Sequence, residues 1–187
     1  MLLAINKQTH IIHNVVLGNK TIDLDLDEVP DGIQPITSYL PHGINPKVFY
    51  PITNDANFNT FANEFKTKHG VDFVVFWNSR NIRRKQPGDI ILAFKLFCDT
   101  LDPEDAQKCC LLMKTHIQDP NGTDLMAVKD MICPDYKVIF VEEVLHPQIM
   151  NYFYNLADVT VNFSSAEGFG LGIAESIMAG TMVTAPV

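Results

Sequence analysis

The sequence predicts an α/β fold: a doubly wound, Rossmann-like parallel sheet with helices on both faces. The first observation is that apolar runs such as Val71–Trp77, Cys109–Lys114 and Val159–Phe163 are nearly continuous, which is typical of strands buried on both faces. The second is that segments long enough for amphipathic helices separate these runs. Strands that alternate with helices, joined by right-handed crossovers, give a doubly wound sheet.

Each expected element follows from its own pattern. Apolar residues spaced three and four apart predict helices, short apolar runs predict strands, and proline or glycine marks several of their ends. The expected strands are Leu2–Ile5, Ile36–Leu40, Val71–Trp77, Cys109–Lys114, Val138–Val141, Val159–Phe163 and Thr181–Val187. The expected helices are Thr9–Val16, Asp55–Lys68, Pro87–Thr100, Asp124–Ile132, Pro147–Leu156 and Gly172–Ala179.

Length and composition limit the class of protein. The 187 residues suit one ordinary domain, or one domain plus a fragment of a neighbour, and 47% hydrophobic with 19% charged residues is a soluble globular profile. A formal net charge of -8 argues against a broad nucleic-acid surface. No apolar run approaches the length of a membrane span. The four cysteines lack the spacing of a metal site, so we expect buried, reduced thiols and no metal.

The segment of residues 164–175 carries the strongest chemical signal. It follows an apolar strand, opens a helix and holds three glycines at alternating positions. Glycines let backbone N–H groups approach a ligand, and a helix N-terminus favours an anion, so the segment predicts a phosphate site. Glu167 and Glu175 bracket that site. A carboxylate beside a bound phosphate has hydroxyl groups as its natural partners, which indicates a phosphorylated sugar compound.

The same residues allow two other interpretations. Ser164 and Glu167 have the spacing of a capping box, in which Glu167 would only close the start of its own helix, while Glu175 in the first turn would complement the helix dipole. The glycine spacing is also weakly similar to a dinucleotide fingerprint. That fingerprint belongs after the first strand and needs an acid about 20 residues later, whereas only 15 residues follow Gly172.

A basic cluster follows the strand that ends at Trp77. Residues 80–85 contain four of the 14 Lys and Arg residues of the chain. They lie at a carboxyl end of the expected sheet, where ligands bind in doubly wound folds. Basic side chains at such a place can neutralise a diphosphate. The alternative is a solvated basic turn without a ligand.

Together these motifs resemble the nucleotide-binding domain of retaining glycosyltransferases with the GT-B fold, specifically glycosyltransferase family four (group 1). Arg80 and Lys85 keep the spacing of the family's Arg and Lys, and Glu167 with Glu175 reads as its E-x7-E motif. Further stretches that match in the family's order are Pro41–Asn45, Ala93–Phe94, Leu156–Val159 and Ala179–Val183. The departures are Ser79 and Gln86 in place of glycine and Met182 in place of proline, and they bear on loop conformation rather than on class.

The resemblance implies a role for each site residue. Arg80, Arg84 and Lys85 would bind the donor diphosphate, and fixed positive groups there would lower the barrier to transfer. Glu167 would contact the transferred sugar rather than act as a nucleophile, and Glu175 would bind the ribose hydroxyls. The remaining binding residues would be Gly168, Phe169, Gly170 and Leu171, through backbone N–H groups, and Gly43 of the loop between domains.

The implied activity is that of a hexosyltransferase-like glycosyltransferase. Its donor would be a UDP- or GDP-linked sugar, its acceptor a glycan, a lipid or a small molecule, and it would require no cofactor. The alternatives are a non-catalytic nucleotide-sugar-binding module, including a decayed transferase, and a nucleotide-dependent oxidoreductase. We expect no nucleic-acid partner and a cytoplasmic location, with the full-length protein either free or peripheral at a membrane.

The resemblance also predicts how the chain is divided. Residues 1–17 would be a remnant of an acceptor domain, 18–35 a linker, and 36–187 an incomplete nucleotide-sugar-binding domain, truncated at its C-terminus and inactive by itself. The last strand, Thr181–Val187, would have both faces buried in a complete domain and would here expose an edge that favours self-association. We expect Trp77 to lie in the core and His42 and His116 to be surface histidines rather than catalysts.

Overall fold

The computed structural model describes residues 2–4, 11–12, 15, 37–39 and 42–186. The chain forms two compact units, Met1–Gly43 and Ile44–Val187. In the first unit, β1 (Leu2–Ala4) and β2 (Thr37–Tyr39) lie within the two strands expected there, and they pair in parallel, which was not predicted. Residues 11, 12 and 15 are helical. The rest of that predicted helix and the domain boundaries predicted at 17–18 and 35–36 lie outside the described residues.

The second unit is built on a five-stranded parallel sheet with the order β5-β4-β3-β6-β7. The chain enters at the central strand, winds to one edge, returns to the other side of the centre and ends at the opposite edge, which confirms the doubly wound α/β class. The strands are β3 (Phe73–Asn78), β4 (Cys109–Lys114), β5 (Lys137–Val141), β6 (Val159–Val161) and β7 (Met182–Thr184). The register places Asn78 beside Lys114 at the carboxyl end of the two central strands.

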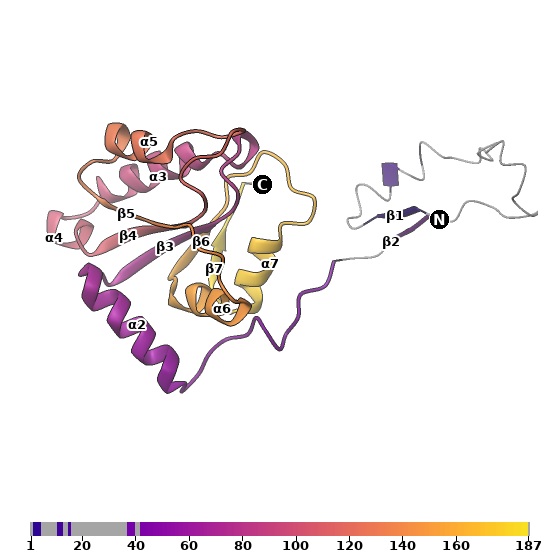
Figure 1. The fold of residues 1–187 in the computed structure, drawn as a ribbon, viewed down its shortest axis with the longest axis horizontal. Coiled ribbons are helices and arrows are strands. Elements are labelled where there is room, and N and C mark those ends of the chain that lie inside the picture. The colour runs from indigo at the N-terminus through magenta and orange to yellow at the C-terminus, as the bar shows by residue number, and fades with distance from the viewer. Residues whose placement is uncertain (1, 5–10, 13–14, 16–36, 40–41, 187) are drawn as a thin grey trace, which may run out of the picture. The chain divides into compact units, whose positions relative to one another are not determined.

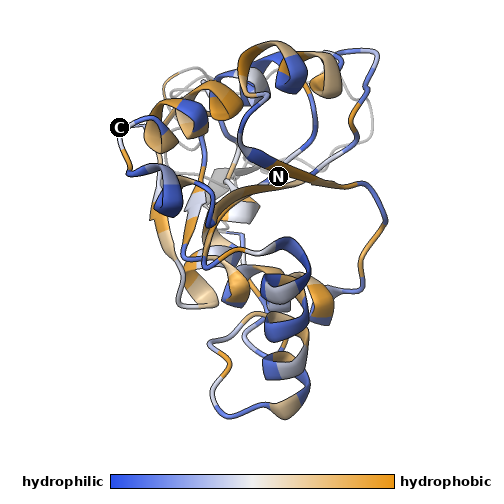
Figure 2. Cartoon of the chain, turned by 90° about the vertical axis from the view of Figure 1, so that its left-hand side faces the viewer, coloured by the Kyte–Doolittle hydropathy of each residue, from blue (hydrophilic) through white to orange (hydrophobic). Residues whose placement is uncertain are grey.

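Helices cover both faces of this sheet (Figure 1). On one face lie α3 (Pro87–Cys98) and α5 (Leu125–Ile132), and on the other lie α2 (Ala56–His69), α6 (Pro147–Leu156) and α7 (Leu171–Met178). Figure 2 shows hydrophobic and hydrophilic residues side by side along the helices, the pattern of elements with one buried face. The sequence did not predict the short α4 (Pro103–Ala106) or the 3-10 helix η1 (Arg83–Lys85).

Side chains of alternate residues in β3 and β4 pack into two hydrophobic cores, one on each face of the sheet. Val75 and Trp77 of β3 point to the α3–α5 side, whereas Val74 and Phe76 point to the α2–α6 side. Trp77 is buried, as predicted. The four cysteines are free and buried, also as predicted, and burial raises the pKa of the Cys98 thiol to about 12. Among the described residues, no helix is long and apolar enough to cross a membrane.

The last strand differs most from its prediction. β7 has only three residues, Met182–Thr184, instead of the seven expected, and the Met182 side chain is exposed on it. The predicted length is therefore wrong, whereas the predicted exposed edge is found, because β7 is the edge strand of the five-stranded sheet and, among the described residues, only β6 pairs with it. Burial of both faces was expected only of a complete domain.

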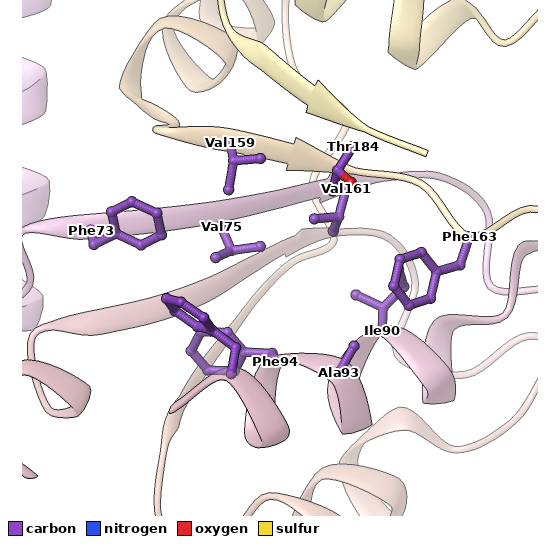
Figure 3. A pocket seen from close by; sticks show the side chains of 10 residues that line it. Phe73, Val75, Ile90, Ala93, Phe94, Val159, Val161, Phe163 and Thr184 are labelled. Atoms are coloured by element: carbon purple, nitrogen blue, oxygen red, sulfur yellow. The ribbon is translucent and has the colours of Figure 1, made fainter. Parts of the chain in front are cut away.

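An apolar pocket of about 220 Å³ opens on the α3 side of the sheet near this edge (Figure 3). Aromatic residues from β3, α3 and the end of β6 surround valines of β3 and β6, and Thr184 of β7 contributes the hydroxyl visible in Figure 3. The lining residues are Phe73, Val75, Ile90, Ala93, Phe94, Phe97, Val159, Val161, Phe163 and Thr184.

Candidate functional site

The 3-10 helix η1 lies against the loop that follows β6. The backbone N–H of Ser165 donates to the Arg84 carbonyl at 2.9 Å, and the Arg84 guanidinium donates to the Ala166 carbonyl at 2.7 Å. These bonds join two segments that are far apart in the sequence. The basic cluster and the glycine-rich loop, each expected at a carboxyl end of the sheet, are thus neighbours in the folded chain.

Glu167 is the acceptor at the centre of this contact. Its Oε1 accepts hydrogen bonds from the Lys85 ammonium and, at 3.1 Å, from Asn162 Nδ2, while Arg84 Nη1 lies 3.5 Å from Oε2. Burial by itself raises the pKa of the Glu167 carboxyl, but the hydrogen bond from Lys85 and the other donors outweigh it, so that the pKa lies below its ordinary value. Glu167 is therefore a carboxylate at neutral pH.

The capping-box interpretation of Glu167 is wrong. Helix α7 begins only at Leu171, after the N-cap Gly170, so no helix starts at Ser164. Gly170 has a φ of 82°, the left-handed conformation that favours glycine. Gly172 serves a different need, because a Cβ there would lie 3.2 Å from the Asn78 carbonyl oxygen. The alternating glycines thus make the turn before α7 and let α7 approach the end of β3.

Glu175 lies in the second turn of α7, not in the first as expected, because the helix starts at Leu171. Its Oε2 accepts a hydrogen bond of 2.7 Å from the Tyr154 hydroxyl, whose oxygen in turn accepts one of 2.8 Å from Asn78 Nδ2. Burial raises the pKa of the Glu175 carboxyl, and the hydrogen bond from Tyr154 acts against that rise. A helix-dipole role is not supported, since the first turn of α7 holds no acid.

Glu175 and Asn78 line an open pocket of about 520 Å³. Lys114, at the end of β4, lies in the same wall, and the segment after β5 and helix α6 provide most of the apolar surface. The other lining residues are Asn45, Val48, Phe49, Val144, Leu145, Pro147 and Met150. A pocket with apolar walls and a few convergent polar groups suits a ligand that has hydroxyl groups and a flat apolar part.

Arg80 has a different neighbour from the rest of the basic cluster. Its Nε and Nη2 donate to the two carboxylate oxygens of Asp119, at 2.7 and 3.1 Å. The Arg80 hydrogen bond holds the pKa of Asp119 below its ordinary value. Arg84 and Lys85 thus contact Glu167, whereas Arg80 fastens the loop after β4 to the end of β3.

The remaining predicted residues have the following places. Gly168 and Phe169 form the bend before α7, and Leu171 is the first residue of that helix. Gly43 is exposed in the first unit, and so is His42. His116 is a surface histidine, as predicted, with Nδ1 3.8 Å from Glu142 Oε1. Among the described residues, no group of three or more His, Cys, Asp or Glu side chains could hold a metal ion.

Four polar residues of the site were missed by sequence reasoning. Asn78 and Asn162 carried a usable signal, because each stands at the carboxyl end of an expected strand. Asp119 lies in a loop whose conformation the sequence pattern does not predict. Tyr154 gave no signal, since it reads as one more residue of an amphipathic helix and meets Glu175 only in the folded chain.

Comparisons with known proteins show that this chain is similar in fold to several solved structures. Neither a family model nor a curated protein matches the sequence. A solved structure of the C-terminal domain of LpcC, a glycosyl transferase group 1 family protein from Francisella tularensis, is similar with a TM-score of 0.61 and 19% identity, over 76% of this chain and 70% of that one. Sucrose-phosphate synthase from Thermosynechococcus elongatus has a TM-score of 0.63 and 21% identity, over 98% of this chain and 39% of that one.

HepE from Anabaena, solved in complex with UDP and glucose, has a TM-score of 0.65 and 14% identity, over 99% of this chain and 44% of that one. The chain thus spans less than half the length of HepE and of sucrose-phosphate synthase. At these identities the likeness concerns the fold, which is that of the C-terminal domains of GT-B glycosyltransferases.

Proposed function

We propose that this chain provides the donor-binding domain of a retaining glycosyltransferase, which transfers a sugar from a UDP- or GDP-linked donor. The observation that carries the proposal is the contact of Lys85 and Arg84 with Glu167 at the entrance to α7. It joins two cations to a carboxylate that lies four residues before the first residue of α7. A diphosphate needs the cations and the helix N-terminus, and a sugar needs the carboxylate.

The diphosphate would lie at the start of α7. Lys85, Arg84 and the backbone N–H groups of residues 168–171 would bind its oxygens. Arg80 would contribute as well, because its pair with Asp119 uses Nε and Nη2 and leaves Nη1 for a phosphate oxygen. As the bond to the sugar breaks, negative charge grows on the departing diphosphate, and these fixed groups would stabilise it. The proposal calls for no metal ion.

The sugar and the nucleoside would lie on opposite sides of the diphosphate. Glu167 would accept hydrogen bonds from the transferred sugar, and Glu175 would accept them from the ribose hydroxyls. The pocket beside Glu175 has apolar walls for a base and one half-buried cation, Lys114. HepE, which has a similar fold, was solved in complex with UDP and glucose, and this supports a nucleotide sugar as the donor.

Calorimetric titration of the chain with UDP and with uridine tests the proposal. We expect Lys85→Ala to weaken UDP binding about tenfold or more, since it removes a charge-assisted hydrogen bond, and to leave uridine binding unchanged. Lys108→Ala is the matched control, because Lys108 is an exposed lysine that directly precedes β4, at the opposite end of the sheet. An equal loss for UDP and uridine, or an equal effect of both variants, would contradict the diphosphate assignment.

A further inference from the structure

The strongest remaining feature is the hydroxyl of Tyr154, which the proposed roles leave unused. The side chain is buried, yet its hydroxyl connects two residues that both line the 520 Å³ pocket. It donates to Glu175 Oε2 and accepts from Asn78 Nδ2, so the three side chains form one chain of hydrogen bonds from the end of β3 to α7.

The direction of this chain of bonds is set by its first member. An amide nitrogen such as Asn78 Nδ2 can only donate, so it engages the Tyr154 oxygen as an acceptor. The hydroxyl proton of Tyr154 is then available for the Glu175 carboxylate. Because Oε2 is engaged in this way, and no hydrogen bond to Oε1 is found among the described residues, Oε1 is the oxygen left for a ligand.

The ring of Tyr154 is held independently of its hydroxyl. Its centroid lies 5.3 Å from that of Phe76 and 5.9 Å from that of Phe49, both in edge-on contacts of the type that aromatic pairs favour. A phenylalanine at this position would keep those contacts. The contribution of the hydroxyl, which donates to Glu175 Oε2, can therefore be measured separately from that of the ring.

We propose that Tyr154 is a positioning residue for ribose recognition: its hydroxyl fixes the Glu175 carboxylate so that Oε1 faces the 2′- and 3′-hydroxyls of a bound nucleotide. This inference rests on the proposed function, since it assumes that a nucleoside diphosphate occupies the pocket. It adds a residue that touches no ligand and acts through Glu175. The consequence is a preference for ribonucleotides over deoxyribonucleotides that depends on a buried tyrosine hydroxyl.

The test is titration of the chain and of its Tyr154→Phe variant with UDP and with 2′-deoxy-UDP. We expect the unaltered chain to prefer UDP, and the variant to lose this preference by about threefold or more, chiefly through weaker UDP binding, because the carboxylate is no longer held. Tyr152→Phe is the matched control. It removes a hydroxyl from the same helix, where the ring contacts Phe58 and Phe61 instead of the pocket, and should leave the ratio unchanged.

The outcomes separate the inference from the function on which it rests. A Tyr154→Phe variant that binds both nucleotides with the original ratio, or that loses affinity for both equally, overturns the positioning role and leaves the function standing. An unaltered chain that binds neither nucleotide overturns both. A second readout needs no ligand. Burial raises the pKa of Glu175, and the hydrogen bond from Tyr154 limits that rise. Carboxyl-carbon NMR should therefore show a higher Glu175 pKa in Tyr154→Phe, and an unchanged pKa contradicts the inference.

Discussion

The Glu167 carboxylate has donors on two sides, with Lys85 and Arg84 from η1 and Asn162 from the end of β6. These partners hold the pKa of Glu167 below its ordinary value. A group whose pKa is lowered by folding stabilises the folded state above its unfolded pKa, and this contribution is lost as the pH falls through the folded pKa. The same contact that we assign to sugar binding thus has a consequence for stability.

We expect Glu167→Gln to lower the free energy of unfolding at pH 7 by up to about 1 kcal/mol, the range of partly exposed ion pairs. The difference from the unaltered chain should begin to shrink as the pH falls below the ordinary pKa of a glutamate, and it should vanish below the lowered pKa of folded Glu167, where the carboxylate is protonated in both states. Urea unfolding at several pH values measures it. Glu64→Gln, at an exposed position of α2, is the control. A Glu167→Gln difference that persists at acid pH would contradict the ion pair.

Gln86 and Arg80 show which features of the site could be predicted from the sequence and which could not. The family resemblance places a glycine at this position, and the structure gives Gln86 a φ of 51°, the left-handed conformation that glycine adopts most easily. The conformation is thus consistent with the pattern although the residue is different. By contrast, no pattern indicated that Arg80 would bind Asp119, because that pair depends on how the loop after β4 folds back.

At the level of elements, the boundaries were predicted well where an element is long and its apolar pattern is clear. The boundaries of β4 (Cys109–Lys114) and α6 (Pro147–Leu156) match the expected ones. The reason is that β4 is a nearly continuous apolar run, and α6 begins at a proline and has one apolar face. The four-residue α4 was missed because it is too short to show a period. β7 was predicted too long because its apolar composition continues beyond the three residues that pair with β6.

The β7 edge leads to a prediction about association. Its outer side has no partner strand among the described residues, Met182 is 71% exposed on it, and the apolar pocket of Figure 3 opens beside it. Unpaired edges with nearby apolar surface pair with other chains. We propose that a second copy of this chain occupies the edge, with a short contact because Pro186 cannot donate a hydrogen bond.

Light scattering over a range of concentrations should therefore show dimers or larger assemblies. Met182→Lys should shift the equilibrium to the monomer, because a lysine on an edge strand opposes pairing. Met131→Lys changes an even more exposed methionine on α5, away from this edge, and should have no effect. A monomer at all concentrations, or equal effects of the two variants, would contradict association through β7.

In the molecule as a whole, the fold determines where the site lies. The doubly wound sheet brings the ends of β3 and β6 side by side, so that η1 meets the loop before α7. Ligands in such sheets bind beyond the carboxyl ends of the strands. The central claim is that a nucleoside diphosphate binds there, with its phosphates at the start of α7 and its nucleoside beside Glu175.

Titration of isotopically labelled chain with UDP, followed by backbone amide NMR, tests that claim most directly. We predict saturable shifts in η1 and in residues 164–172, at the phosphate end, together with shifts near Asn78 and Lys114, at the nucleoside end. Shifts confined to the apolar pocket around Phe97 and β7, or no shifts at UDP concentrations that saturate ordinary nucleotide sites, would contradict it.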